Sequence, residues 1–165
     1  MNNIIALAGH SNSGKTTLIE KMIPEFKNRG YTVCVIKHIL SYLDLDKEGK
    51  DTYRFAKAGA DMVIMEDKET LAVVKKIKEE EKLENLINNY AKEYDLIIVE
   101  GFKGENVPQI GVYTDIKRVN WDKEKLIAVI GERLKDLNLP VFNRDDYMKV
   151  ADFIEEKIIG GPGRI

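Results

Sequence analysis

Nine residues near the start of the chain have the types and the spacing that hold a phosphate group. They read Gly-His-Ser-Asn-Ser-Gly-Lys-Thr-Thr, the pattern of glycines, lysine and hydroxyl residues that is typical of phosphate-binding loops. Backbone N–H groups of such a loop, together with the start of the following helix, attract the anion. We expect Lys15 to contact the β- and γ-phosphates and the Thr16 hydroxyl to bind Mg²⁺. The predicted nucleotide-binding residues of the loop are Gly9, His10, Ser11, Asn12, Ser13, Gly14, Lys15, Thr16 and Thr17.

Two flanking elements are expected to hold this loop in place. The run Ile4–Ala8 before it is wholly apolar, as in a parallel strand that is buried on both faces. The stretch Leu18–Arg29 after it repeats apolar residues at helical spacing and ends before Gly30. A second strand, Thr32–Ile36, follows. Because strand, helix and strand succeed one another, the two strands should be parallel and the crossover right-handed.

The remaining chain continues to alternate between strands and helices. Its expected elements are a helix over Asp51–Lys57, strands over Asp61–Met65 and Thr70–Val74, a helix over Lys82–Lys92, strands over Asp95–Val99, Pro108–Thr114, Leu126–Ile130 and Pro140–Phe142, and a helix over Asp146–Ile159. The polar alternation of Pro108–Thr114 indicates an exposed or edge strand. This order predicts an α/β, three-layer P-loop NTPase fold with a mainly parallel sheet and an edge hairpin or extended strand. We expect one domain over residues 1–159 and a flexible C-terminal tail over residues 160–165.

Acidic residues at the carboxyl edge of this sheet are candidates for binding the metal that accompanies the phosphates. In an open α/β sheet the ligand lies outside the carboxyl ends of the strands. Glu100 follows such a strand, where an acid binds Mg²⁺ through water or positions an attacking water, unless it is an ordinary strand-end acid. Asp46, with Asp44 beside it, lies in the loop after the second strand and either joins the Mg²⁺ shell or is solvated. The candidate catalytic residues are therefore Glu100 and Asp46, and Thr16 joins them as a candidate metal ligand.

Basic residues are expected near the same edge. Lys50 and Arg54 can share one helix face, where they would meet phosphate or an anionic group of a partner. Lys103 follows Glu100 closely, and Lys37 follows the second strand. Together these cations predict a locally positive mouth of the site. A plain surface role is the alternative for each of them.

A second short pattern, Asn143 and Asp146 with Arg144 between them, follows the Pro140–Phe142 strand. Many GTPases read guanine with Asn-Lys-x-Asp, in which the Asp accepts the two ring N–H groups and excludes adenine. Here Arg144 replaces the lysine, and the pattern comes one strand later than in those proteins. Asn and Asp are also common before helices, so these residues either contact a guanine base or cap the last helix.

The overall composition excludes several other classes of protein. The chain has 165 residues and a formal net charge of −2, which gives no basic footprint for a nucleic acid. No apolar run reaches the length of a membrane helix and no signal peptide precedes the first strand, so we expect a cytoplasmic protein without a membrane partner. Cys34 is the only cysteine, and neither His10 nor His38 has a His or Cys partner at metal spacing. No zinc site is therefore predicted.

Four segments of the chain share their order and spacing with a known family over roughly residues 3–112. They are Gly9–Thr17; Lys37-His38 with Asp44-x-Asp46 and Gly49-Lys50-Asp51-Thr52-Tyr53-Arg54; Ala58-Gly59-Ala60; and Glu100-Gly101-Phe102-Lys103. With these segments the chain resembles the molybdopterin-guanine dinucleotide biosynthesis protein B (MobB) family. The phosphate loop is common to many families, whereas the other segments are much more particular to this one.

The resemblance implies a homodimeric, GTP-binding P-loop protein that serves as an adaptor in making the guanine dinucleotide form of the molybdenum cofactor. The implied partner is the guanylyltransferase that joins GMP to molybdopterin, and molybdopterin or its guanine dinucleotide is an implied ligand. The implied cofactors are GTP and Mg²⁺, and the implied activity is at most a slow GTPase. By position, Asp46 and Glu100 would lie near the metal, and Lys50, Arg54 and Lys103 would be cations at the edge of the site.

Departures from the family pattern and two other functions stay open. The family often has histidines where this chain has Leu40 and Ser41, so any role of those histidines is absent here. It also often has a lysine and an acid where this chain has Gln109 and Gly111. The alternatives are a P-loop kinase that acts on a small anionic metabolite and a GTPase metallochaperone for metalloenzyme maturation. The low count of cysteine and histidine disfavours the latter unless a dimer interface completes a metal site.

Overall fold

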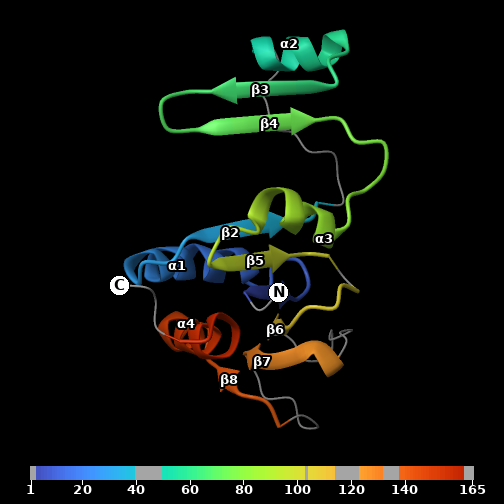
Figure 1. The fold of residues 1–165 in the computed structure, drawn as a ribbon. Helices are drawn as coiled ribbons and strands as arrows, with labels where there is room; N and C mark the ends of the chain where they lie inside the picture. The colour runs from blue at the N-terminus through green and yellow to red at the C-terminus, as the bar shows by residue number, and fades with distance from the viewer. Residues whose placement is uncertain (1–2, 40–49, 103, 114–122, 132–137, 162–165) are drawn as a thin grey trace. The chain divides into compact units, whose positions relative to one another are not determined.

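The fold divides into two compact units (Figure 1). A computed structural model describes residues 3–39, 50–102, 104–113, 123–131 and 138–161. The first unit combines Met1–His38 with Leu86–Ile165, and the second is Ile39–Asn85. Each unit has a sheet of its own. That residues 1–159 act as one domain stays a prediction.

The first unit contains a six-stranded parallel sheet with the order β2-β5-β1-β6-β7-β8. Its elements are β1 (Ile4–Ala8), α1 (Lys15–Asn28), β2 (Val33–Lys37), η1 (Ile87–Ala91), β5 (Leu96–Glu100), β6 (Gln109–Val112), η3 (Lys123–Lys125), β7 (Leu126–Ile130), β8 (Val141–Phe142), α4 (Tyr147–Ile154) and η4 (Glu155–Ile159). This arrangement confirms the predicted α/β fold with a mainly parallel sheet. β5 lies between β1 and β2, so the strand that follows the first helix is at the edge of the sheet.

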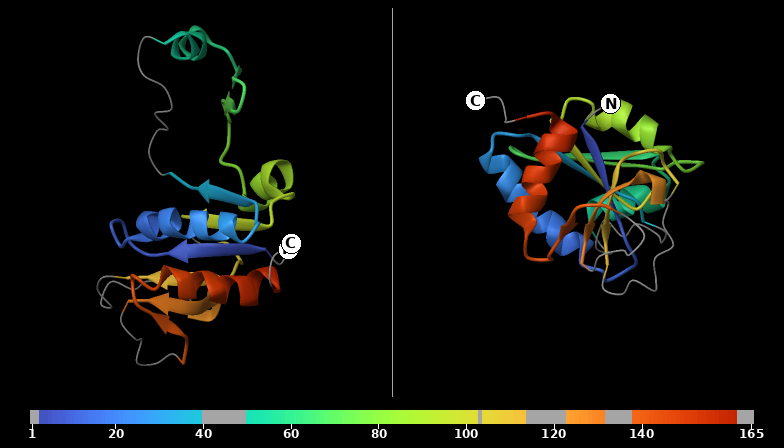
Figure 2. Two further views of the ribbon diagram at one scale, coloured as in Figure 1. Left: turned by 90° about the vertical axis from the view of Figure 1, so that its left-hand side faces the viewer. Right: turned by 90° about the horizontal axis from the view of Figure 1, so that it is seen from below.

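Helices cover both faces of this sheet (Figure 2). α1 and α4 lie side by side on one face, and η1 lies on the other. β1 and β5 are buried at their first four positions, as expected for apolar strands between two helical layers. Met22 and Phe26 of α1 and Ile154 of α4 have no exposed surface and form the centre of the larger core. This packing places the carboxyl ends of β1 and β5 next to each other.

The strand after Pro108 differs from the expectation. β6 lies between β1 and β7, and all four of its residues are buried, so the prediction of an exposed or edge strand was wrong. Gln109 is only 7% exposed, and Gly111 has no side chain to reach solvent. The alternation of residue types in this segment therefore did not reflect an alternation between core and water.

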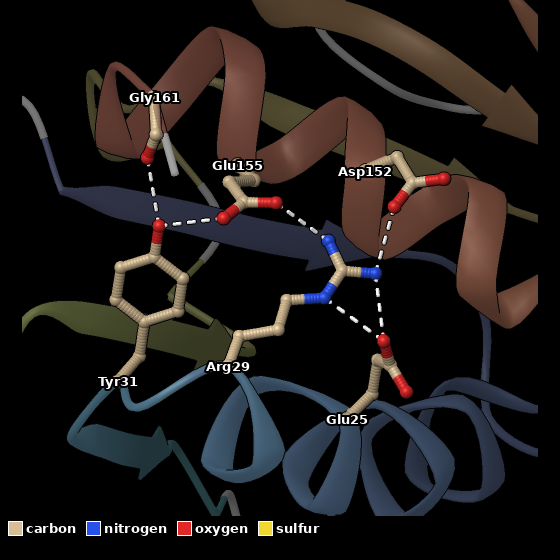
Figure 3. A network of polar contacts seen from close by, with 6 residues as sticks. All are labelled: Glu25, Arg29, Tyr31, Asp152, Glu155 and Gly161. Carbon is tan, nitrogen blue, oxygen red and sulfur yellow. Dashed lines mark hydrogen bonds and ion pairs between the residues drawn. The ribbon is translucent and has the colours of Figure 1, made fainter. Parts of the chain in front are cut away.

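A polar network joins the end of α1 to the last helix (Figure 3). Three carboxylates surround the Arg29 guanidinium, whose side chain is 18% exposed: those of Glu25 at 2.7 Å, Asp152 at 2.7 Å and Glu155 at 2.6 Å. The Tyr31 hydroxyl donates a hydrogen bond to Glu155 at 2.6 Å. Burial, together with this carboxylate, raises the pKa of Tyr31 to about 12. The network fixes the helical layer on one face of the sheet.

The second unit contains a helix and a hairpin. Its elements are α2 (Asp51–Ala58), β3 (Met62–Glu66), β4 (Leu71–Lys75) and most of α3 (Leu83–Leu86). The two strands formed where they were predicted, with small shifts in their bounds, and they pair antiparallel as a separate two-stranded sheet rather than as an edge of the larger one. Asp67 shapes the hairpin loop, because its carboxylate accepts backbone N–H bonds from Glu69 at 2.9 Å and Thr70 at 2.7 Å. These hydrogen bonds lower the pKa of Asp67.

Two of the predicted helices end in a wider helical turn. α3 continues into the π-helical turn η1, and α4 continues into η4. In η4 the Gly160 N–H donates to the Glu155 carbonyl five residues earlier, at 3.0 Å. Within the ranges that the structure describes, no helix combines the length and the apolar character needed to cross a membrane.

Candidate phosphate-binding site

The backbone of the predicted phosphate loop turns sharply between β1 and α1. Gly14 has a φ of 97° and Asn12 a φ of 63°, a left-handed region that glycine and asparagine tolerate best. A Cβ atom on Gly9 would collide with the Val112 carbonyl oxygen and lie 2.6 Å from the Ser13 Oγ atom. Both glycines of the motif are therefore required by the backbone, one for its conformation and the other for its close contact with β6.

Lys15 lies over this loop at the first position of α1. Its ammonium donates to the carbonyl oxygens of Gly9 at 3.1 Å and His10 at 2.9 Å. No acidic residue is present in the first turn of α1, so the positive end of the helix is not neutralised from within. The ammonium and the helix start thus form one region of positive potential.

The loop also contains a buried hydroxyl. Ser13 is 1% exposed, and its Oγ has no hydrogen-bond partner within the part of the chain that the structure describes. Thr16 and Thr17, in contrast, are exposed in the first turn of the helix. The N–H groups of a helix start, an ammonium and hydroxyls in one turn fit a phosphate group, which is the chemistry predicted from the sequence.

Glu100 stands at the end of β5, directly beside β1. Its backbone pairs in register with Leu7 on one side and with Lys37 on the other. The Lys37 ammonium lies 3.4 Å from Glu100 Oε2, and the Glu100 side chain is 14% exposed. The carboxyl ends of β1, β2 and β5 therefore lie side by side, as the sequence predicts. The ion pair between Lys37 and Glu100 was not predicted, although it follows from the register of β2 against β5.

The turn after Glu100 is held against the end of β2. The His38 N–H donates to the Glu100 carbonyl at 2.8 Å. Gly101 has a φ of 96°, and a Cβ atom there would lie 2.7 Å from the His38 Cβ. Phe102 has a φ of 50° and packs against the His38 ring, with 4.8 Å between the centroids and the ring planes tilted by 39°. The Glu-Gly-Phe segment is thus shaped by its contact with β2.

The Asn143–Asp146 pattern forms a closed turn after β8. One Asp146 carboxylate oxygen accepts from both the backbone N–H and the side-chain amide of Asn143, each at 3.2 Å. The hydrogen bond from the Asn143 backbone N–H lowers the pKa of Asp146, and the nearby Lys149 ammonium lowers it further. Arg144 donates to the Tyr113 carbonyl at 2.5 Å and so ties this turn to the end of β6. These bonds account for the pattern as a local turn, and guanine recognition stays a prediction.

The remaining predicted site residues belong to the second unit or lie outside the described residues. Lys50 and Arg54 belong to the second unit, where Arg54 pairs with Asp51 at 3.3 Å. Asp46 and Lys103 lie outside the described residues. Among the described residues, no group of three or more His, Cys, Asp or Glu side chains forms a metal cluster. Among the described residues, Glu100 and Thr16 could hold a metal here together with the oxygens of a phosphate ligand, as is common for Mg²⁺.

The parallel sheet with a glycine-lysine-threonine loop after its central strand defines an α/β protein of the P-loop class. The profile of the family described as "Molybdopterin guanine dinucleotide synthesis protein B" matches residues 4–132. The chain therefore belongs to this family, MobB, and is an adapter-type protein of molybdopterin guanine dinucleotide biosynthesis.

Individual relatives agree with this assignment. The chain is 35% identical over 161 residues to the molybdopterin-guanine dinucleotide biosynthesis adapter protein of Haemophilus influenzae, covering 94% of this chain and 90% of that protein. It is 33% identical to the protein of the same name from Escherichia coli, covering 93% and 91%. The crystal structure of Bacillus subtilis MobB superposes with a TM-score of 0.80 at 27% identity and covers 96% of this chain and 99% of that chain.

Proposed function

We propose that the protein is a cytoplasmic adaptor that binds GTP with Mg²⁺ and assists the molybdopterin guanylyltransferase, with slow GTP hydrolysis at most. The observation that carries this proposal is the phosphate loop of β1 and α1, with Lys15 above it and Glu100 at the neighbouring strand end. Membership of the MobB family supplies the pathway. Molybdopterin or its guanine dinucleotide would be a further ligand of the complex between this protein and the transferase.

Residues of the loop and of its surroundings have distinct roles in this proposal. Helix N–H groups and Lys15 would hold the phosphates, and the exposed Thr16 hydroxyl would ligate Mg²⁺. Mg²⁺, when bound with the nucleotide, would supply positive charge to the phosphates. Glu100 would bind the metal through water. Asp46 would add a second acid.

Slow hydrolysis follows from the surroundings of Glu100. A general base for water must present a carboxylate that is ready to accept a proton. The Glu100 carboxylate is instead committed to a cation in both states: it is 3.4 Å from the Lys37 ammonium here, and it would hold hydrated Mg²⁺ when GTP is bound. We therefore propose that the site holds GTP for a partner's reaction rather than turning it over.

We further propose a homodimer in which the hairpin of the second unit contacts a second copy of the chain. Its outer face carries large apolar side chains that are 46–65% exposed, namely Met62, Ile64, Leu71 and Val73. A two-stranded sheet is only marginally stable alone, and such a surface is typical of an interface. Glu66 and Lys75 lie on this face at opposite ends and on opposite strands. A two-fold axis would therefore bring each charge toward its opposite.

A thermal-shift titration tests nucleotide binding. At 100 times the dissociation constant, GTP with Mg²⁺ should add about 2.7 kcal/mol to the free energy of unfolding. For a chain of this size that raises the melting temperature by about 5–10 °C. Lys15→Ala should lose the shift, whereas Lys21→Ala, a change at an exposed lysine of the same helix, should keep it. A chain that neither GTP nor ATP stabilises contradicts the proposal, and stabilisation by ATP alone removes the guanine preference.

Turnover and partner binding test the adaptor role. Slow GTP hydrolysis together with GTP-dependent retention on immobilised molybdopterin guanylyltransferase is the expected result. Rapid phosphate transfer to a small anionic acceptor would replace the adaptor with a kinase. Retention that is the same with and without GTP would remove the nucleotide dependence from the proposal.

A further inference from the structure

The Lys37 ammonium lies beside the Glu100 carboxylate, which is the group that the proposed function assigns to the metal. β2 ends at Lys37 and β5 ends at Glu100, and the two residues are register partners in adjacent parallel strands. The ammonium is 3.4 Å from Glu100 Oε2. Because the Glu100 side chain is only 14% exposed, its carboxylate has little access to water and depends on nearby positive charge.

The same carboxylate lies close to the phosphate loop. Glu100 pairs with Leu7 in β1, and the loop begins two residues later at Gly9. A divalent cation that reaches Glu100 from the loop side must compete with the Lys37 ammonium, since both are attracted to the same oxygens. Lys37 differs from Glu100 in being 51% exposed, so its side chain has room to leave the carboxylate. An ammonium that leaves needs another acceptor, and a nucleotide supplies one in its phosphate oxygens.

We propose that Lys37 is a positioning residue that makes metal binding conditional on the nucleotide. In the absence of a nucleotide, Lys37 neutralises Glu100 and weakens the binding of a bare divalent cation. When a nucleotide brings phosphate oxygens, Lys37 transfers to them and Glu100 becomes available to the metal. The inference rests on the proposed function, because that function gives Glu100 its role in binding the metal.

The size of the effect follows from the exposure of the pair. Ion pairs that are partly open to water change an equilibrium by about 1.4- to fivefold. Lys37→Met removes the ammonium and keeps most of the side-chain length. We therefore expect this variant, without nucleotide, to bind Mn²⁺ more tightly than the unchanged protein, by up to about fivefold. Lys37→Arg keeps the charge and should bind Mn²⁺ as the unchanged protein does.

The test is a double-mutant cycle that is read by the electron paramagnetic resonance of free Mn²⁺, with no measurement of turnover. It compares the unchanged protein, Lys37→Met, Glu100→Gln and the double variant, each first shown by circular dichroism to be folded. The gain in Mn²⁺ affinity from Lys37→Met should vanish in the Glu100→Gln background, because the carboxylate charge for which the two cations compete is gone. With GTP present, the difference between Lys37→Met and the unchanged protein should shrink or reverse.

Two results overturn the inference. One is a Lys37→Met variant that binds Mn²⁺ no more tightly than the unchanged protein, and the other is an equal gain in the Glu100→Gln background. The proposed function fails separately. If Glu100→Gln has no effect on Mn²⁺ affinity in the GTP-loaded protein, the metal role of Glu100 is lost, whereas loss of GTP binding altogether contradicts the nucleotide role of the loop.

Discussion

Replacement of Arg29 is expected to loosen the joint between α1 and the last helix. Its guanidinium is mostly buried and makes charge-assisted contacts to Glu25, Asp152 and Glu155 within 2.7 Å. Arg29→Met keeps an unbranched apolar stem in place of the aliphatic part of the side chain and removes every one of these contacts. Glu25 and Glu155 are then left with little access to water, since their side chains are only 21% and 18% exposed.

The magnitude can be worked out partner by partner. Loss of a charge-assisted hydrogen bond to a largely buried carboxylate costs about 1.5 kcal/mol, so Glu25 and Glu155 together contribute about 3 kcal/mol. Asp152 is 66% exposed and contributes about 0.5 kcal/mol at most. Arg29→Met should therefore lower the free energy of unfolding by about 3 kcal/mol. Arg29→Lys keeps one charge but cannot span three acids, and about half of the loss should remain.

Urea unfolding followed by far-ultraviolet circular dichroism measures this change. The matched control is Lys21→Met, because Lys21 also joins α1 to a residue near α4, at 3.4 Å from Asp145, but is well exposed. Its loss should be below about 0.5 kcal/mol. The reasoning is refuted if Arg29→Met costs less than about 1 kcal/mol or if the two variants cost the same.

Three further predictions address the loop, the same network and the hairpin. Gly9→Ala forces a Cβ atom against the Val112 carbonyl oxygen, so the GTP affinity measured by calorimetry should fall at least about tenfold. An unchanged affinity would show that the loop accommodates the extra atom. The pKa of Tyr31 is raised to about 12, so the stabilisation from its neutral form is complete below about pH 10 and disappears as the pH rises through 12. Melting curves from pH 9 to 12 should accordingly fall more steeply for the unchanged protein than for Tyr31→Phe, and parallel curves would contradict this. Ile64→Lys, next to Val73 on the exposed hairpin face, should convert a dimer to monomers in sedimentation velocity, and a persistent dimer would exclude this face as the contact.

The parts of the fold that the sequence predicted are those encoded by local patterns. The apolar run of β1, the glycine-lysine loop and the helical spacing of α1 lie within one stretch of chain, and each element formed where its pattern indicates. β6 was misjudged because its burial comes from β1 and β7 on either side, and Gln109 and Gly111 carry no signal of those neighbours. Pairing between distant segments decides the environment of a strand more than its own alternation does.

The same distinction applies to the site. The rule that ligands lie at the carboxyl ends of parallel strands was enough to place Glu100 near the loop. It did not predict the contact with Lys37, since that contact depends on the register of β2 against β5. The Arg29 network joins residues more than 120 positions apart, and neither segment alone has a pattern that predicts it. Guanine recognition by Asn143 and Asp146 stays a prediction that the closed turn neither requires nor forbids.

The position of β5 between β1 and β2 has a consequence for how the chain is made. During synthesis β1, the phosphate loop, α1 and β2 leave the ribosome first, but β1 and β2 are not neighbours in the sheet and cannot pair to complete it. The second unit must be synthesised before Glu100 emerges and β5 fills the gap. Contacts over such sequence distances make folding slow. A nascent chain that stops before residue 100 therefore exposes two strand edges and has a phosphate loop without its neighbouring acid, so the site can be completed only after most of the protein has been made.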